Sequence, residues 1–181
     1  MMHAGRRYLV LAVFAICAAS GGIARDLEMN LEWELVADTV MGGVSTGAVR
    51  WDDNRQVATL TGDVSLENNG GFVQMAADFR DGRAHFDASG FDGVTLEVKG
   101  NGEVYDLRLR TDALSRPWQS FRTDFTAPES WTTVRVPFTN FEPHRTDARF
   151  DPARLRRVGI LAIGRAFQAE VSVRGFGFYA D

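Results

Sequence analysis

Short runs of alternating apolar and polar residues dominate the chain from Trp33 to its end. Apolar residues occupy every second position over residues 94–99, again over 105–110 after a glycine-rich turn at 100–102, and once more over 133–138. Because successive side chains of a β-strand point to opposite faces of the sheet, each run predicts a strand with one buried face. The first two runs and the turn between them predict a β-hairpin.

The C-terminal part of the chain carries two further strand signals. Residues 158–163 are almost continuously apolar, which predicts a strand that is covered on both faces or lies near the centre of a sheet. In the last segment the apolar positions are odd-numbered up to Val173 and even-numbered from Phe176, with Gly175 between them. One extra residue at this glycine would return both sets to the same face, so we expect a β-bulge there.

These patterns predict an all-β protein, a single antiparallel β-sandwich or jelly roll. No segment has the length and periodicity of a long helix, and only residues 152–156 resemble a helical turn. Many short strands, 18 glycines and frequent turns favour an antiparallel sandwich over a parallel α/β sheet. No internal repeat or proline-rich linker interrupts residues 25–181, which we therefore expect to form one domain.

The N-terminal segment has the three parts of a secretory signal peptide. Arg6 and Arg7 provide a basic start, residues 8–19 are apolar and uncharged, and small residues follow. We expect a signal helix within residues 1–24 that is cleaved on export, leaving a periplasmic or secreted domain without a stable membrane span. An uncleaved membrane anchor is the alternative, which the shortness of the apolar run disfavours.

Composition and charge narrow the classes of function. The single cysteine, Cys17, lies in the signal segment, so the mature domain has no disulfide and no thiol chemistry. The net charge of −4 argues against nucleic acid as a partner. His85 and His144 have no metal-ligand spacing and no G-x-S-x-G motif occurs, so we expect neither a cofactor nor an enzyme. A hydrolase or lyase with paired carboxylates is the lowest-ranked alternative, since acidic residues are abundant.

Two glycine-rich segments form the candidate binding site. DTVMGGVS covers residues 38–45, and ENNGGF covers residues 67–72. Each suits a tight turn, because glycine and asparagine adopt the positive φ angles of turns, and the second segment alone favours a hairpin. Their polar side chains also suit a ligand or partner, although the first segment lacks the lysine of a phosphate-binding P-loop. The candidate ligand- or partner-binding residues are Asp38, Met41, Gly42, Gly43, Ser45, Glu67, Asn68, Asn69, Gly70 and Gly71.

An aromatic residue in a loop offers a second candidate site. Trp118 lies in the polar segment 113–120, where its ring is placed either to stack on a sugar or to cap the edge of the sandwich. We expect the other tryptophans of the domain, which stand at strand positions, to belong to the core: Trp33, Trp51 and Trp131. Three arginines project from polar faces that are either solvated or suited to an acidic partner: Arg108, Arg110 and Arg135.

Three segments together resemble one protein family. Residues 33–45, followed by residues 62–72, resemble the signature of the complex I intermediate-associated protein 30 family, and residues 131–141 resemble its W-x-x-V-x-x-P-F-x-x-F pattern. The resemblance covers nearly all of the mature chain. It implies a galactose-binding-domain-like jelly roll, a fold shared with carbohydrate-binding modules, in which the DTVMGGVS and ENNGGF segments pack together.

The resemblance also implies a function. Mitochondrial members of the family have a chaperone-like role in assembling respiratory complex I, whereas this chain carries an export signal in place of a transit peptide. We therefore expect a non-enzymatic, exported binding or assembly-factor module whose partner is a protein or a glycan. The alternative is a carbohydrate-binding module of the cell envelope that uses Trp118 with Arg110, Arg116 and Gln119.

Overall fold

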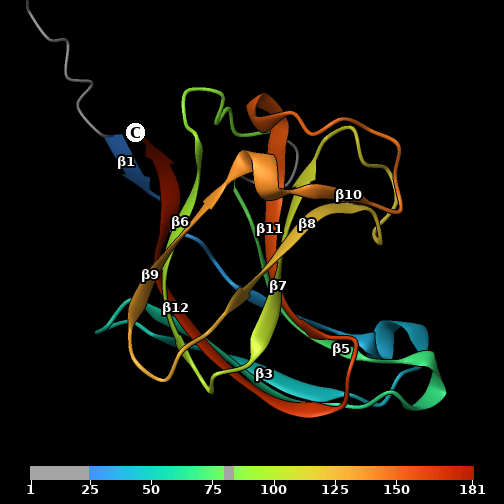
Figure 1. The fold of residues 1–181 in the computed structure, drawn as a ribbon. Coiled ribbons are helices and arrows are strands. Elements are labelled where there is room, and N and C mark those ends of the chain that lie inside the picture. Colours follow the sequence, from blue (N-terminus) through green and yellow to red (C-terminus); the bar gives the residue numbers. More distant parts are fainter. Residues whose placement is uncertain (1–24, 80–83) are drawn as a thin grey trace, which may run out of the picture.

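The computed structural model describes residues 25–79 and 84–181 and shows two antiparallel sheets packed as a sandwich (Figure 1). The prediction of an all-β sandwich is confirmed. The predicted signal helix within residues 1–24 lies outside the described residues.

Each sheet contains six strands. Sheet A has the order β3 (Thr46–Asp52), β4 (Val57–Val64), β12 (Phe167–Ala180), β6 (Gly93–Gly100) and β9 (Thr132–Pro137), with β1 (Arg25–Glu28) also paired to β12. Sheet B has the order β10 (Glu142–His144), β8 (Ser120–Thr126), β7 (Val104–Thr111), β11 (Leu155–Ile163), β5 (Phe72–Asp78) and β2 (Glu34–Ala37). Short 3₁₀ helices occupy four connections: η1 (Asp38–Met41), η2 (Glu67–Asn69), η3 (Phe138–Asn140) and η4 (Pro152–Arg154).

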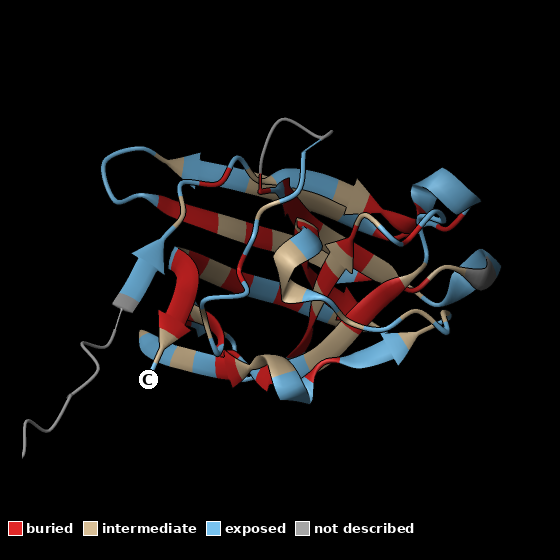
Figure 2. Cartoon of the chain, turned by 90° about the horizontal axis from the view of Figure 1, so that it is seen from above, coloured by how far each residue is buried: buried red, intermediate tan, exposed pale blue. Residues whose placement is uncertain are grey.

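The core fills the space between the sheets. Inward-facing residues such as Leu96 of β6, Leu107 of β7 and Ile160 of β11 are fully buried. Figure 2 shows the buried residues along the strands and the exposed residues in the loops and at strand ends. Aromatic rings gather around Phe178, which stacks on Phe86 with ring centroids 5.1 Å apart. This packing supplies the stability of a domain that has no disulfide.

The apolar run at 158–163 is part of a central strand, as predicted. β11 pairs with β5 on one side and with β7 on the other, and residues 158–162 are all buried. The helical turn predicted at 152–156 is present as η4, immediately before this strand.

Two predicted hairpins are wrong, because the chain changes sheet at each turn. β6 belongs to sheet A and β7 to sheet B, so the alternating runs at 94–99 and 105–110 lie in opposite layers instead of pairing. The ENNGG turn likewise joins β4 of sheet A to β5 of sheet B. Alternation identifies the buried face of a strand but not its partner, and here both sheets bury one face.

The bulge predicted at Gly175 is confirmed. The register between β12 and β6 shifts between Arg174 and Gly177, and Gly175 has a φ angle of 58°. On its other edge β12 pairs with β4 as far as Val173 and with β1 from Gly177 onward. The bulge therefore coincides with a gap in strand pairing between the ends of β4 and β1.

Candidate functional site

The two glycine-rich segments meet at the carboxylate of Asp38. This fully buried side chain accepts hydrogen bonds from the backbone N–H groups of Gly71 (2.6 Å) and Phe72 (3.2 Å) in the second segment. Within its own segment it accepts bonds from the N–H (3.0 Å) and the hydroxyl (2.5 Å) of Ser45. The DTVMGGVS and ENNGGF segments are thus held together, as the family resemblance implied.

Asp38 stays ionised in spite of its burial. Burial alone raises the pKa of this carboxyl, but hydrogen bonds from the Ser45 hydroxyl and from the N–H groups of Gly71, Phe72 and Ser45 outweigh it and lower the pKa below its usual value. Donors of the chain itself approach both carboxylate oxygens. The structure therefore gives Asp38 and Ser45 the role of joining the two segments.

The glycines of both segments permit this close packing. A Cβ atom at Gly43 would lie 2.4 Å from Cγ of Asp38, and one at Gly70 would lie 2.5 Å from its Oδ2. Gly42 and Gly71 have φ angles of 87° and 133°, in the region that favours glycine. Since η1 joins β2 to β3 and η2 joins β4 to β5, the segments are two adjacent crossings between the sheets, and the glycines let them approach one another.

These two crossings expose apolar side chains to solvent. Val40 and Met41 are 74% and 64% exposed, and Val44 and Leu66 are 42% and 53% exposed. Ser65, which precedes Leu66, donates a hydrogen bond of 3.0 Å from its backbone N–H to the hydroxyl of Ser45, which follows Val44. Figures 1 and 2 show η1 and η2 as neighbouring coils at one end of the sandwich. We refer to these four apolar residues as the loop-pair surface.

Some of the predicted site residues reach this end of the molecule. Met41 belongs to the loop-pair surface, and the exposed Glu67 and Asn68 stand beside it in η2. Asn68 has a φ angle of 55°, and Asn69 is the last residue of η2. Val40 and Val44 lie within the first predicted segment, although they were not among its candidate residues, and Leu66 lies just before the second. Their signal is the occurrence of apolar residues in or next to glycine-rich turns.

Trp118 and Arg110 lie elsewhere. Trp118 is 50% exposed in the connection between β7 and β8, as predicted. Arg110 donates a hydrogen bond to the carbonyl of Arg116 (2.9 Å) and so braces this connection. In the register of sheet B, Arg110 is level with Asp78 at the last residue of β5, whereas η2 precedes the first, about 20 Å away along the strand. The predicted site residues therefore fall into two separate places.

The strand arginines have partners within the chain. Arg108 lies 3.0 Å from the carboxylate of Asp106. Arg135 lies 2.9 Å from Asp181, and its guanidinium stacks over the ring of Tyr179 at 3.9 Å. Because β7 and β9 belong to different sheets, these arginines do not form one row for an acidic partner.

The tryptophans expected in the core are only partly covered. Trp51 is 43% exposed, so its predicted burial is wrong, because it lies near the end of β3, an edge strand. Trp33 is half-buried and packs edge-on against Phe176 with ring centroids 6.2 Å apart. Trp131 is half-buried beneath the guanidinium of Arg174, 4.3 Å from its ring centroid.

The histidines lie apart from these places. Burial and the nearby Arg108 and Arg122 lower the pKa of His144, so this side chain favours the neutral form. His85 lies 3.4 Å from Asp112. Over residues 25–79 and 84–181, no group of three or more His, Cys, Asp or Glu side chains is placed to hold a metal ion. No helix in this part of the chain is long and apolar enough to cross a membrane.

Solved structures with a similar fold include carbohydrate-binding modules. The family 11 module from Clostridium thermocellum, in complex with a β-1,3-1,4-mixed-linked tetrasaccharide, has a TM-score of 0.62 and 11% identity, covering 87% of this chain and 95% of the module. A family 30 carbohydrate-binding module has a TM-score of 0.58 and 14% identity, covering 89% of each chain. At these identities the similarity establishes the shared fold.

Sequence comparison gives the family. No curated protein matches the sequence of this chain. Residues 25–173 match the family described as Complex I intermediate-associated protein 30. This match spans most of the sandwich, from β1 into β12, and includes both sheet crossings that Asp38 joins. The chain therefore belongs to the complex I intermediate-associated protein 30 family.

Proposed function

We propose that this protein is a non-enzymatic binding module that takes part in the assembly of a protein complex and contacts its protein partner through the loop-pair surface. The observation that carries the proposal is the exposure of Val40, Met41, Val44 and Leu66 on two crossings fixed by one buried carboxylate. Membership of a family named for its association with complex I intermediates supports a protein as the partner.

The physical character of this surface favours a protein over a small molecule. Large apolar side chains that stand exposed together on a soluble domain mark interaction surfaces. Methionine is enriched in interface cores, and the exposed polar residues Glu67 and Asn68, which directly follow Leu66, suit an interface rim. The hydrogen bonds of Asp38 hold both loops in place before binding, which lowers the entropic cost of association.

The proposed location of this partner is the periplasm or the cell exterior. It rests on the basic, apolar and small-residue sections within residues 1–24, which match a secretory signal. A protein at this location would not meet the arm of complex I that faces the matrix or cytoplasm. We therefore propose that the partner is an envelope or secreted protein.

Crosslinking and affinity capture from the native envelope test the proposal. The double variant Val40→Ser/Met41→Ser is expected to retain the melting temperature of the wild type, because both side chains are mostly exposed, and to lose the captured protein. Trp118→Ala is the matched control, because it removes an exposed apolar side chain at the other end of sheet B. Equal capture by the wild type and the double variant would contradict the proposed surface.

A further inference from the structure

A groove with two tryptophans lies at the gap between the ends of β4 and β1. One cavity of about 330 Å³ extends from Glu28 to the bulge at Gly175, and an adjoining cavity of about 420 Å³ extends to Asp53. Both volumes fall within the range of small-ligand sites, about 300–1,000 Å³. The residues that line both cavities are Asn30, Leu31, Trp33, Trp51 and Gln56.

The rings of this groove are held in place by the chain. The indole N–H of Trp51 donates a hydrogen bond of 2.6 Å to the carboxylate of Asp53. The side-chain amide of Gln56 donates one of 2.7 Å to the backbone carbonyl of Asp53, and Trp33 rests edge-on against Phe176. A ligand that stacks on these rings therefore meets groups that are already oriented.

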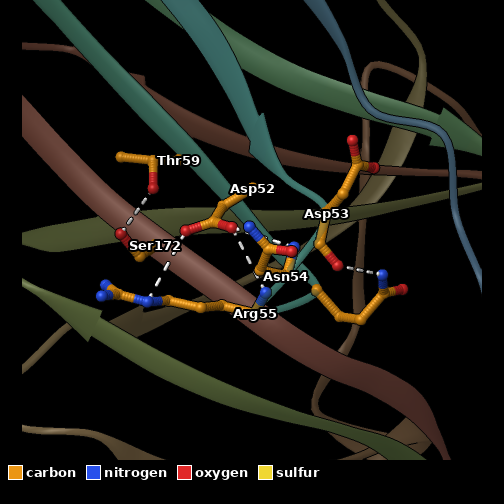
Figure 3. A network of polar contacts seen from close by, with 7 residues as sticks. Asp52, Asp53, Asn54, Arg55, Thr59 and Ser172 are labelled. Carbon is orange, nitrogen blue, oxygen red and sulfur yellow. Dashed lines mark hydrogen bonds and ion pairs between the residues drawn. The ribbon is translucent and has the colours of Figure 1, made fainter.

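The turn between β3 and β4 is itself braced by polar contacts. Asp52 accepts hydrogen bonds from the backbone N–H groups of Asn54 (3.0 Å) and Arg55 (3.3 Å), as Figure 3 shows. Behind it, the hydroxyls of Thr59 and Ser172 are 2.8 Å apart across β4 and β12. The turn that carries Asp53 is thus tied to the body of sheet A.

The charges around the groove disfavour an anionic ligand. The one arginine that lines either cavity, Arg174, forms a two-pronged ion pair with Glu97 at 2.6 and 2.7 Å and lies over Trp131. Glu28, Glu32 and Asp53 add carboxylates, of which Asp53 already accepts from Trp51, and the amides of Asn30 and Gln56 both donate and accept hydrogen bonds. This combination suits a neutral ligand with many hydroxyl groups.

We propose that this groove binds pyranose units of a neutral glycan. The C–H face of a pyranose ring carries partial positive charge and stacks on the negative face of an indole, while its hydroxyls bond to amides and carboxylates at the rim. Trp51, with its fixed and exposed ring, provides the stacking platform. Trp118 lines neither of these two cavities, and the guanidinium of Arg116 lies 6.0 Å from its ring centroid.

The glycan site is separate from the loop-pair surface. Trp51 is five residues along β3 from Thr46, which follows Ser45 of the first crossing, so the two places are about 17 Å apart along the strand. The inference goes beyond the proposed function and does not rest on it: a protein partner and a glycan would occupy the molecule at the same time.

Binding of defined oligosaccharides to the purified protein, as processed by its own cells, tests the glycan site. The probes are cellohexaose, laminarihexaose, mannohexaose and agarohexaose. Tetramethylammonium is added separately to test whether the groove prefers a cation. Binding is followed by tryptophan fluorescence. We expect at least one neutral oligosaccharide to bind and Trp51→Ala to weaken it by about tenfold or more. Trp118→Ala and Val40→Ser/Met41→Ser should leave the affinity unchanged.

Three results would overturn the inference. They are the absence of binding by any of the four oligosaccharides, binding that Trp118→Ala abolishes and Trp51→Ala does not, or binding of tetramethylammonium alone. If Trp51→Ala fails to fold, the test is made on the wild type instead, by recording the indole N–H signals of its tryptophans in NMR spectra. The signals of Trp33 and Trp51 should then shift on addition of glycan, and a shift confined to Trp118 would be contrary to the proposal.

Discussion

The carboxylate of Asp38 accepts a hydrogen bond of 2.6 Å from the backbone N–H of Gly71, 33 residues further along the chain. This bond joins the crossing from β2 to β3 to the crossing from β4 to β5. One buried side chain thereby fixes the relative position of two connections that the sequence places far apart. The family signature is explained by this packing, since its glycines surround the carboxylate.

Replacement of Asp38 is expected to destabilise the fold strongly. Asp38→Ala removes the acceptor of several buried donors, including the N–H groups of Gly71 and Phe72, and we expect a loss of about 3 kcal/mol or more in the free energy of unfolding. Urea denaturation of the wild type and the variant measures this loss. A variant within about 0.5 kcal/mol of the wild type would show that these hydrogen bonds contribute little.

The same carboxylate should make stability depend on acid pH. The pKa of Asp38 is lower in the folded state than in the unfolded chain, so its contribution is present above the unfolded value, about 3.9, and is lost as the pH falls through the folded value. Melting temperatures recorded from neutral to strongly acidic pH check this. Asp38→Asn, which does not titrate, should show a flatter decline over the acid range than the wild type, and parallel curves would contradict the assignment.

Two neighbouring glycines should respond differently to alanine. Gly43→Ala places a methyl group 2.4 Å from Cγ of Asp38 and should cost about 3 kcal/mol, because the carboxylate must move from its donors. Gly42→Ala meets no atom within 4 Å and should cost only about 1 kcal/mol, the strain of its φ angle of 87°. Equal losses in thermal unfolding would mean that backbone conformation, not contact with the carboxylate, selects both glycines.

Tyr105 should resist ionisation in the folded state. Burial raises the pKa of its phenol to about 12, and the hydroxyl donates to Asn101 (2.8 Å) and accepts from the N–H of Glu170 (2.9 Å). Because the folded pKa lies above the unfolded value of about 10, the stability from the neutral phenol is full below the unfolded value and is lost as the pH rises through the folded one. Tyrosinate absorbance during alkaline titration measures this ionisation.

The variant Tyr105→Phe tests the same phenol by stability. It leaves the N–H of Glu170 without its acceptor and should lower the free energy of unfolding by about 1–2 kcal/mol. The variant should also lack the late-titrating step of the absorbance curve. If wild type and variant titrate identically, Tyr105 is not the group that ionises last.

Export can be checked by fractionation. The signal-like section within residues 1–24 leads us to expect a protein in the periplasm or medium whose first residue lies between about 20 and 25, by the small-residue rule for signal cleavage. N-terminal sequencing of the recovered protein measures the cleavage point. Intact protein in the cytosol would remove the export proposal, and intact protein in the membrane fraction would favour an anchor.

The strands and the bulge could be predicted from sequence because both follow from local alternation. The shift from Val173 to Phe176 required one extra residue at Gly175, and the register has it. The partners of the strands could not be predicted in this way. A strand with one buried face fits either layer of a sandwich, so the runs at 94–99 and 105–110 gave no sign that the chain changes sheet between them.

The position of the candidate site in the sequence could be predicted, but which of its residues pack the loops and which are exposed for binding could not. Asp38 and the glycines stood out by composition, yet burial and hydrogen bonding are tertiary properties that assign them to the packing of the crossings. The exposure of Val40 and Trp51 runs against the usual burial of large apolar residues. The position of Val40 in a glycine-rich turn is its one sequence signal, whereas Trp51 stands in an alternating strand pattern that gives none. This exposure is the basis of the two proposed binding surfaces.

The pairing of Arg25 with Ala180 has a consequence for the time at which the domain can form. β12 is the last strand to be synthesised, yet it pairs with β1, β4 and β6 and so supplies the middle of sheet A. Until that strand has left the ribosome, the earlier strands of sheet A lack their common neighbour, and contacts between distant parts of a chain form slowly. Sheet A therefore cannot be completed until β12 has been made, so the docking of this strand is a late step in the formation of that layer.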